Sequence, residues 1–570
     1  MKKKIGVYVC HCGGNISDYV DIEKVKDAVK DEANVYLLKN TMFACSDSNQ
    51  KEMVEDIKTS ELDAIVVASC SPKLHVPTFR AAAERGGLNP YKYVQVNIRE
   101  QDSWAHSDNP IGATEKAILL VKAGIARAAE SEALTSMKIP TTNAVAVIGA
   151  GVGGMRSAIA LADMGTEVYL IEKEASVGGH TANWGQLFTT NIEGKELVEN
   201  LYSDIKKRSN IKVFTNAELT EKKGSIGNFD IKVTTGSEIL PLHVGAFVIN
   251  TGFDSYEPGK SEYSYGDLDN VITLPQFKTL IEKSVKELIY QGKKIKTIAY
   301  IYCIGSRQDE EGGENKYCSR FCCTAAIHSS IQVKNKFKNI TNLHFNRGIR
   351  TYGKQELLYD ESSKNGDIYL QFSLDSIPQI EKKGNKTFVK VNDILSAGKL
   401  IEAEADLIVL VTGMVPRKNE SLIKQLKIPV GRDHFFNEIH MKLRPVETVI
   451  DGVFIAGTCQ SPKNILETIN SSMAAAAKAN SILTKGEISL SPTLAMVNPA
   501  ACILCEKCFA ACPFDAIVTS DYEGRMVAKV NPSNCKGCGM CTPVCTTDAI
   551  DLAGFTNPQI EGMIDALSES

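Results

Sequence analysis

The chain has 570 residues, of which 43% are apolar and 23% charged, a composition typical of folded proteins with ordinary cores. Its length predicts about three or four domains. The net charge of −4 and the pI near 6.2 give no electrostatic basis for binding nucleic acid or an anionic membrane. We expect no signal peptide, because Cys10 and Cys12 interrupt the short apolar run after the first lysines, and we expect no membrane span. These features predict a cytoplasmic protein.

Cysteine is the unusual component of this composition. The chain has 17 cysteines, and a large intracellular protein does not use them as a disulfide framework, which is typical of small secreted domains. They fall into three groups: four before residue 71, four between residues 303 and 323, and eight after residue 501, with Cys459 left over. The grouping indicates metal ligands.

Residues 1–140 alternate expected strands and helices, beginning with KIGVYV, DIEKVKDAVK, NVYLLK and SNQKEMVEDIKT. Such alternation predicts a parallel sheet, whose strands end at one common edge. Cys10 and Cys12 follow the first strand, Cys45 follows the second, and Cys70 ends the third. We therefore expect these four thiols to hold a [4Fe–4S] cluster. A zinc ion, or cysteines with only structural or redox roles, are the alternatives.

A dinucleotide-binding fingerprint begins at residue 144. The buried strand AVAVIG leads into Gly149-x-Gly151-x-x-Gly154, a helix to about residue 164, and a second strand that ends at Glu172. The glycines allow a tight turn, a close approach of the backbone to pyrophosphate, and packing of helix on strand. The helix N-terminus would receive the phosphate charge, and Glu172 would bind ribose hydroxyls.

Later segments indicate FAD as the dinucleotide. VINTGF (248–253) and LIVLVTGMVP (407–416) resemble the Thr-Gly turns of flavoproteins with two dinucleotide domains. DGVFIAGTC (451–459), followed by NILETINSSMAAAAKA, resembles the last FAD-binding segment of thioredoxin reductases. The expected FAD-binding residues are Gly149, Gly151, Gly153, Gly154, Glu172, Lys173, Gly179, Thr251, Gly252, Thr412, Gly413, Gly457, Thr458, Lys463 and Asn464.

A second Gly-rich fingerprint for NAD(P)H is missing. At its expected place the sequence reads TIAYIYCIGSR (297–307), and YCSRFCC follows at 317–323. We expect Cys303, Cys318, Cys322 and Cys323 to hold a non-standard [4Fe–4S] cluster where a nicotinamide nucleotide would otherwise bind. Buried packing cysteines are the alternative.

The C-terminal region resembles a bacterial two-cluster ferredoxin. Two runs share the spacing Cys-x2-Cys-x2-Cys-x3-Cys, and in such modules the fourth cysteine ligates the other cluster. Zinc sites usually need only two Cys-x2-Cys pairs. The expected ligands are Cys502, Cys505, Cys508 and Cys545 for one [4Fe–4S] cluster and Cys535, Cys538, Cys541 and Cys512 for the other.

The runs VCHCGGNISDYVDIEKV, ASCSPKLHVPTFR, CIGSR, YCSRFCC, RTYGK and GVFIAGTCQSPK together resemble the A subunit of heterodisulfide reductase (HdrA) and its bacterial relatives. The resemblance implies FAD, four [4Fe–4S] clusters and the ligand sets given above. The expected fold class is α/β, with a thioredoxin-reductase-like FAD core of two dinucleotide domains. The expected regions are an N-terminal parallel-sheet cluster domain (1–140), FAD-binding parts 141–260 and 400–490, a degenerate NAD(P)-like domain with a cluster site (261–399), and a ferredoxin domain (491–570).

The same resemblance implies an oxidoreductase that serves as the electron-transfer subunit of a larger complex, with electron bifurcation or confurcation left open. The implied partners are HdrB- and HdrC-like subunits, ferredoxin, and a donor module linked to hydrogenase (MvhD-like), formate dehydrogenase or NADH, around a homodimeric core. Two alternatives are a self-contained NAD(P)H-dependent flavoprotein oxidoreductase and a non-catalytic cluster scaffold.

Three further residues are candidates for the redox chemistry. Methanogen members of the family place a lysine five residues after the Cys-Cys pair, where this sequence has His328. They also carry a ferredoxin-like insertion that is missing here between residues 180 and 300. A histidine beside the flavin predicts redox behaviour that depends on pH between about 6 and 8. Lys354 is either a cation that faces the flavin or a solvated surface lysine, and Cys459 is either a packing residue or a reactive thiol.

Overall fold

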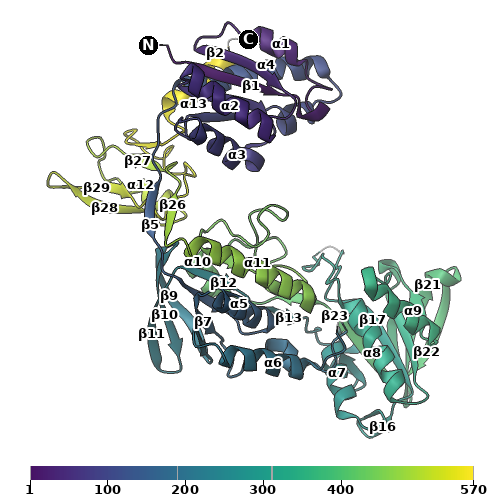
Figure 1. Ribbon diagram of the computed structural model, residues 1–570. Helices are drawn as coiled ribbons and strands as arrows, with labels where there is room; N and C mark the ends of the chain where they lie inside the picture. The colour runs from purple at the N-terminus through teal and green to yellow at the C-terminus, as the bar shows by residue number, and fades with distance from the viewer. Residues whose placement is uncertain (1, 189, 310–311, 569–570) are drawn as a thin grey trace. The chain divides into compact units, whose positions relative to one another are not determined.

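The computed structural model describes residues 2–188, 190–309 and 312–568 (Figure 1). The chain forms two compact units: the first contains residues 1–138 and 489–570, and the second contains residues 139–488. Strands β5 (Met137–Pro140) and β26 (Glu487–Leu490) lie where the chain passes from one unit to the other. Among the described helices, none combines the length and the hydropathy needed to cross a membrane.

The N-terminal part of the first unit is a parallel sheet with helices on both faces. Its elements are β1 (Ile5–Cys10), α1 (Ile22–Val29), β2 (Val35–Thr41), α2 (Asp47–Ser60), β3 (Ala64–Ser69), α3 (Pro72–Arg85), β4 (Tyr93–Asn97) and α4 (Pro110–Ala129). The strand order is β2-β1-β3-β4, and all pairs are parallel. Successive residues of β1 face opposite cores: Val7 packs with α1 and α4, and Tyr8 with α2 and α3. The predicted sheet is confirmed, although β4 was not predicted.

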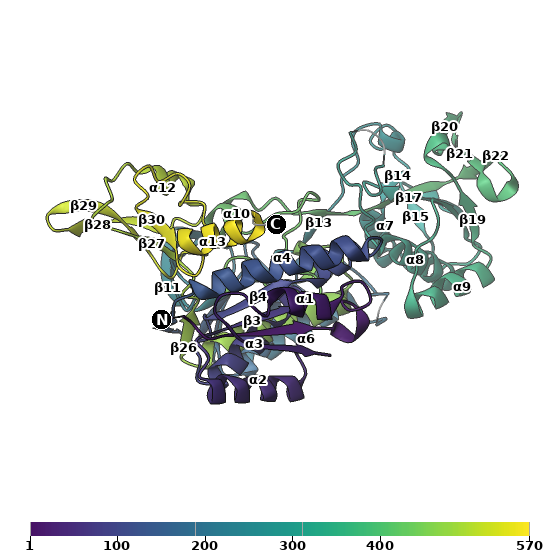
Figure 2. The same cartoon turned by 90° about the horizontal axis from the view of Figure 1, so that it is seen from above.

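The C-terminal part of the first unit contains two small antiparallel strand pairs and two helices. They are β27 (Ala495–Val497) with β30 (Ile550–Leu552), β28 (Ile517–Tyr522) with β29 (Arg525–Val530), α12 (Lys507–Ala511) and α13 (Asn557–Ser568). Helix α13 lies along α4 (Figure 2). Gln559 donates a hydrogen bond to the carbonyl of Glu130 (3.2 Å), and Arg127 donates one to the carbonyl of Gly554 (3.0 Å). These contacts join the last helix and the segment before it to the end of α4.

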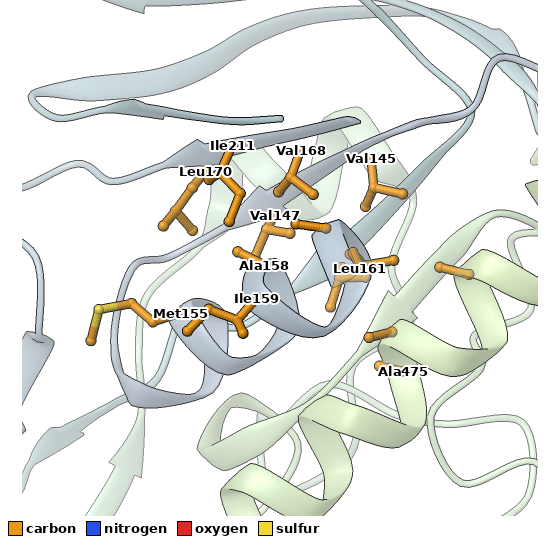
Figure 3. Packing of buried hydrophobic residues seen from close by; sticks show 14 of the residues in the cluster. Val145, Val147, Met155, Ala158, Ile159, Leu161, Val168, Leu170, Ile211 and Ala475 are labelled. Atoms are coloured by element: carbon orange, nitrogen blue, oxygen red, sulfur yellow. The ribbon is translucent and has the colours of Figure 1, made fainter. Parts of the chain in front are cut away.

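The second unit contains two five-stranded parallel sheets. The first sheet and its helices are β6 (Ala144–Ile148), α5 (Val152–Asp163), β7 (Glu167–Ile171), α6 (Gly194–Lys206), β8 (Ile211–Phe214), β12 (Ala246–Ile249), β25 (Val453–Ile455) and α11 (Ile465–Leu483). The strand order is β25-β12-β6-β7-β8. Apolar side chains of β6, β7 and β8 pack over α5, which also contacts α11 (Figure 3). An antiparallel sheet of β9 (Ala217–Ser225), β10 (Asn228–Thr235) and β11 (Glu238–Val244) precedes β12.

The second sheet has the order β14-β23-β17-β18-β19. Its elements are β14 (Val271–Thr273), α7 (Leu274–Lys283), β17 (Thr297–Ile304), α8 (Cys322–Lys336), β18 (Thr341–Asn346), α9 (Glu356–Lys364), β19 (Ile368–Gln371) and β23 (Leu407–Thr412). An antiparallel sheet of β20 (Gln379–Lys383), β21 (Lys386–Asp393) and β22 (Lys399–Ala405) precedes β23. Because β23 pairs with β14 and β17, the second sheet extends past the boundary expected at residue 400.

The remaining elements of the second unit are short. They are the antiparallel pairs β13 (Phe253–Ser255) with β24 (Met414–Pro416) and β15 (Ile289–Tyr290) with β16 (Lys293–Lys294), and the helix α10 (Glu420–Leu426). The β13–β24 pair joins the two chain segments that run between the parallel sheets. The α/β fold class with parallel sheets is confirmed.

Candidate functional site

The turn between β6 and α5 requires glycine at two positions. Gly149 has φ +97°, and a Cβ on it would lie 2.4 Å from the carbonyl oxygen of Asn250. A Cβ on Gly154 would lie 1.7 Å from the carbonyl oxygen of Gly149, so α5 packs directly against the turn. At Gly151, by contrast, no heavy atom of the described chain other than those of Gly151 and its two sequence neighbours lies within 4 Å of the Cβ position. This open space at the N-terminus of α5 suits a pyrophosphate.

Glu172 lies directly after β7 and is 6% exposed. Its Oε2 accepts a hydrogen bond from the amide of Ala150 (2.7 Å), and its Oε1 accepts one from the amide of Glu174 (3.0 Å). Each carboxylate oxygen can accept a second hydrogen bond, which leaves capacity for ribose hydroxyls. The side chain thus holds the Gly-rich turn and borders the space beside it.

A cavity of about 720 Å³ opens beside this turn, within the range of cofactor sites. Of the residues expected to bind FAD, only Gly154 does not line it, because Gly154 lies within α5 and packs against the carbonyl of Gly149. The expected residues that line the cavity are Gly149, Gly151, Gly153, Glu172, Lys173, Gly179, Thr251, Gly252, Thr412, Gly413, Gly457, Thr458, Lys463 and Asn464. The space and the donors therefore fit a dinucleotide.

Another wall of the same cavity comes from the second sheet. Cys322 and Ala325 of α8 and Lys278 of α7 line it, together with Trp184 from the segment after β7. A molecule bound against the Gly-rich turn can therefore reach the helix that carries the Cys-Cys pair.

The structure brings the four middle cysteines together. Cys303 lies near the end of β17, Cys318 lies in the loop that follows, and Cys322 and Cys323 begin α8. Burial raises the pKa of Cys303 to about 11, and the charges of Cys323 and Cys318 raise it as well. The hydrogen bond from Cys322 lowers the pKa of Cys323. Thiols of this kind lose their protons when a metal binds.

Arginines lie near two of these cysteines, Cys303 and Cys323. Arg307 lies 3.9 Å from the sulfur of Cys303 through Nη1 and donates to the carbonyl of Arg347 (2.8 Å). Arg347 donates in return to the carbonyl of Arg307 (2.7 Å). The hydrogen bond from Cys322 is the largest cause of the lowered pKa of Cys323, and the charge of Arg350 makes a smaller contribution in the same direction. This positive charge would stabilise a thiolate-bound cluster.

The N-terminal cysteines also converge, at the carboxyl edge of the first unit's sheet. Burial raises the pKa of Cys10, and the charges of Cys12 and Cys45 raise it further. Burial also raises the pKa of Cys70 to about 11, with smaller contributions from Cys12 and Cys10. Arg99, which follows β4, donates a 3.1 Å hydrogen bond to the sulfur of Cys12. Sequence reasoning missed Arg99 because β4 was not predicted.

In the C-terminal part, Cys512 lies with the second cysteine run. Burial raises the pKa of Cys541 to about 11, and Cys535, Cys512 and Cys538 add to that rise through their charges. These four cysteines also line one small cavity. Backbone amides donate to the sulfurs, as from Ala516 to Cys512 at 3.3 Å. The crossed ligand set that was expected for this cluster is therefore geometrically available.

All seventeen cysteines are free. Among the described residues, no three His, Cys, Asp or Glu side chains converge as ligands of one metal ion would. A cubane spreads its ligands, because each of its four irons binds a different cysteine.

The three candidate redox residues lie outside the cavity lining. His328, on α8, is 4% exposed, and its Nδ1 has no hydrogen-bond partner among the described residues. Lys354 lies on an exposed turn before α9. Cys459 is buried, and its thiol donates to the carbonyl of Ala456 (3.0 Å), which matches a packing role. Lys278, in contrast, lines the cavity and was not predicted, because its helix is distant in sequence from both motifs.

Two family models match the chain. A 4Fe–4S dicluster domain matches residues 495–552, which include all eight C-terminal cysteines, and an FAD-dependent oxidoreductase domain matches residues 144–237. The matches identify an FAD-binding region and an iron–sulfur region. Thioredoxin reductase from T. acidophilum is similar in structure, with 18% identity, 60% of this chain and 99% of that chain covered, and a TM-score of 0.42.

Curated relatives match nearly the whole chain. The second iron–sulfur A subunit (A 2) of CoB–CoM heterodisulfide reductase from Methanopyrus kandleri is 35% identical, over 92% of each chain. The A subunit of the H2:CoB-CoM heterodisulfide,ferredoxin reductase of Methanothermobacter marburgensis is 34% identical over 90% of each. The A subunit of the H2/formate:CoB-CoM heterodisulfide,ferredoxin reductase of Methanococcus maripaludis is 32% identical over 99% of this chain and 98% of its own length. The chain therefore belongs to the family of heterodisulfide reductase A subunits, which are oxidoreductases.

Proposed function

We propose that the chain is the electron-transfer subunit of a heterodisulfide-reductase-like complex and holds one FAD and four [4Fe–4S] clusters. The FAD site is the cavity beside Gly151, and the clusters are held by the three groups of cysteines, the last of which holds two. Its partners would be B and C subunits, ferredoxin and a hydrogenase-, formate- or NADH-linked donor module around a homodimeric core. The names of two relatives, which include ferredoxin, H2 and formate, support ferredoxin and a hydrogenase- or formate-linked donor.

One observation carries the proposal: a single cavity is bordered by both the Gly-rich turn and Cys322. FAD supplies two-electron chemistry and can release electrons singly, whereas a [4Fe–4S] cluster passes one electron at a time. The residues of the first sheet hold the dinucleotide, and α8 presents a cluster ligand to the same space. With both cofactors bound, the shared wall would give electrons a short path between them.

The turn after β17 argues against a nicotinamide nucleotide as the direct donor. Gly305 has φ +66°, and a Cβ on it would lie 1.9 Å from Cγ of Tyr256. The ring of Tyr256 thus covers the place where a dinucleotide phosphate would approach this strand. The corresponding space at Gly151 is open.

Metal analysis with matched variants tests the cofactor assignment. The anaerobically purified chain should contain about sixteen irons, four for each cluster. Cys322→Ser should lower the iron content by about four per chain and leave FAD in place. Cys459→Ser, which alters another buried cysteine of the same unit, should leave the iron content unchanged. Equal iron in both variants would remove Cys322 from the ligand set.

The direction of electron flow is tested by flavin absorbance under anaerobic conditions. Reduced ferredoxin should bleach the flavin of the isolated chain, whereas NADH and NADPH should not. Rapid bleaching by NADH would instead support a self-contained NAD(P)H-dependent oxidoreductase. Bifurcation is assayed separately, by asking whether one donor reduces both ferredoxin and the partner subunits.

A further inference from the structure

Lys278 places an incompletely paired ammonium group in the wall of the cavity. The residue lies on α7, is half-buried, and lines the same space as the Gly-rich turn. Its Nζ donates to the carbonyl of Gln186 at 3.5 Å, the outer limit of a hydrogen bond. Within the described parts of the chain, no carboxylate forms an ion pair with it. A lysine in this setting has donors left over for a molecule in the cavity.

The position of Lys278 identifies the part of FAD that it would face. The Gly-rich turn and Glu172 belong to the first sheet and suit the pyrophosphate and the ribose. Lys278 and Cys322 come from the helices of the second sheet, so the space beside them is left for the isoalloxazine ring. Electron transfer to a cluster held by Cys322 also requires the ring on this side.

His328 lies behind the same wall and cannot share the charge. Its side chain is 4% exposed and does not line the cavity. Burial, and then the charge of Lys278, lower the pKa of His328 to about 4. Burial also lowers the pKa of Lys278, but the charges of Glu282 and Glu193 oppose that shift. At neutral pH, therefore, His328 is uncharged, and of these two groups only Lys278 lines the cavity and can place a positive charge there.

Reduction adds negative charge to a flavin, and a cation in a desolvated cavity stabilises that charge more strongly than one in water. Building on the proposed binding of FAD in this cavity, we propose that Lys278 supplies positive charge that stabilises the reduced flavin from the side of the second sheet. Neither His328 nor Lys354 supplies it. Lys278 is then a determinant of the flavin potential that comes from a helix outside both the fingerprint and the cysteine motifs.

The test is an anaerobic redox titration of the flavin in the full chain, followed by flavin absorbance. Lys278→Met should shift the flavin midpoint potential to a more negative value, because the charge is lost while most of the length of the side chain is kept. Lys278→Arg should retain the wild-type potential. Lys354→Met is the matched control, since this exposed lysine lies outside the cavity, and it should have no effect.

An unchanged potential in Lys278→Met would overturn the inference, as would an equal shift in Lys354→Met or His328→Gln. Should Lys278→Met fail to retain FAD, Lys278→Gln, which keeps a polar donor, is titrated instead and should show the same negative shift. Failure of the proposed function looks different: the wild-type chain would then purify without FAD, or Cys322→Ser would keep all of its iron.

Discussion

The two parallel sheets of the second unit match element by element along the chain. In the first, β6, α5, β7, α6 and β8 are followed by the antiparallel strands β9–β11 and by β12. In the second, β17, α8, β18, α9 and β19 are followed by β20–β22 and by β23. The strand orders also correspond, with β6 and β17 at the centre. The same architecture thus occurs twice, and what differs between the two copies indicates their ligands.

The difference lies in the connection that follows the central strand. After β6, a short glycine turn leads directly to α5 at Val152. After β17, the chain makes a longer loop and begins α8 only at Cys322. The short turn presents amides of a helix N-terminus, which suit phosphate, whereas the longer loop presents thiols, which suit iron. A difference in one connection thus accompanies the expected difference in cofactor.

The first residue after the neighbouring strand, β7 in one sheet and β18 in the other, also differs in charge between the two sheets. Glu172 follows β7 and is an acceptor for hydroxyl groups, whereas Arg347 follows β18 and interlocks with Arg307 beside Cys303. A carboxylate suits a ribose, and guanidinium groups suit a negatively charged cluster. The charge at this corresponding position therefore follows the expected ligand.

The largest expected effect is a loss of FAD from the first sheet alone. Gly151→Val places a branched side chain in the open space beside α5, so FAD affinity should fall by about a hundredfold or more. Iron content should not change. FAD is measured by fluorescence after release from the protein. Gly259→Val, where a Cβ would meet only Oε2 of Glu262 at 3.8 Å and which lies outside the cavity, is the control in the same unit. Normal FAD content in Gly151→Val would show that the turn does not receive the pyrophosphate.

The corresponding experiment on the second sheet replaces one of its cysteines. Cys323→Ser should remove one cluster in four and leave both the FAD and the EPR signals of the C-terminal clusters in place, because the ligand sets are separate. The measurement is iron content together with EPR of the reduced protein. Loss of the C-terminal signals with retention of the others would mean that the cysteines are wrongly partitioned. Simultaneous loss of FAD would contradict the independence of the two sheets.

Local patterns predicted much of these sites. Glycine spacing gave the turn at Gly149 and Gly151, since strand, turn and helix are neighbours in sequence. Strand ends predicted the N-terminal cysteine group, and spacing in the sequence predicted the two other groups. The residues that were missed depend on packing between distant segments: Lys278 reaches the cavity from α7, and Arg99 reaches Cys12 from β4. No local spacing relates such positions to a motif. The placement of Lys354 was undecided for the same reason, because only the fold determines which surface a turn occupies.

A smaller effect is expected at Glu172. Glu172→Gln retains a carbonyl acceptor for the amide of Ala150 but loses the charge that would bind ribose hydroxyls. FAD affinity should therefore fall by about tenfold, since hydrogen bonds to charged groups contribute roughly 1.5–3 kcal/mol and part of this is kept. The dissociation constant is measured by flavin fluorescence. Glu167→Gln, at the opposite end of β7 and paired with Lys212, should not change it. Equal affinity in both variants would argue that Glu172 serves only to hold the turn.

The smallest effect near neutral pH concerns His328. A histidine beside the flavin was expected to give pH-dependent redox behaviour between about 6 and 8. Burial, with a further contribution from Lys278, instead lowers its pKa to about 4, so the side chain stays neutral throughout that range. The change in flavin midpoint potential between pH 6 and pH 8 should therefore be the same in the wild type and in His328→Gln. A different pH dependence in the variant would place the titration of His328 near the flavin after all.

The consequence of the lowered pKa should appear in stability at acidic pH. In the unfolded chain a histidine titrates near pH 6.5, so above that pH neither state is protonated and the full stability is present. As the pH falls from 6.5 towards 4, the unfolded state binds a proton that the folded state does not, and the folded state loses stability on the order of 3 kcal/mol. Anaerobic urea denaturation at pH 7 and pH 5 should show a smaller loss for His328→Gln than for the wild type. Lys278→Met should reduce the loss only in part, because burial is the larger cause of the lowered pKa. An identical loss in wild type and His328→Gln would mean that His328 is solvated. The conclusion that His328 stays neutral behind Lys278 would then be wrong.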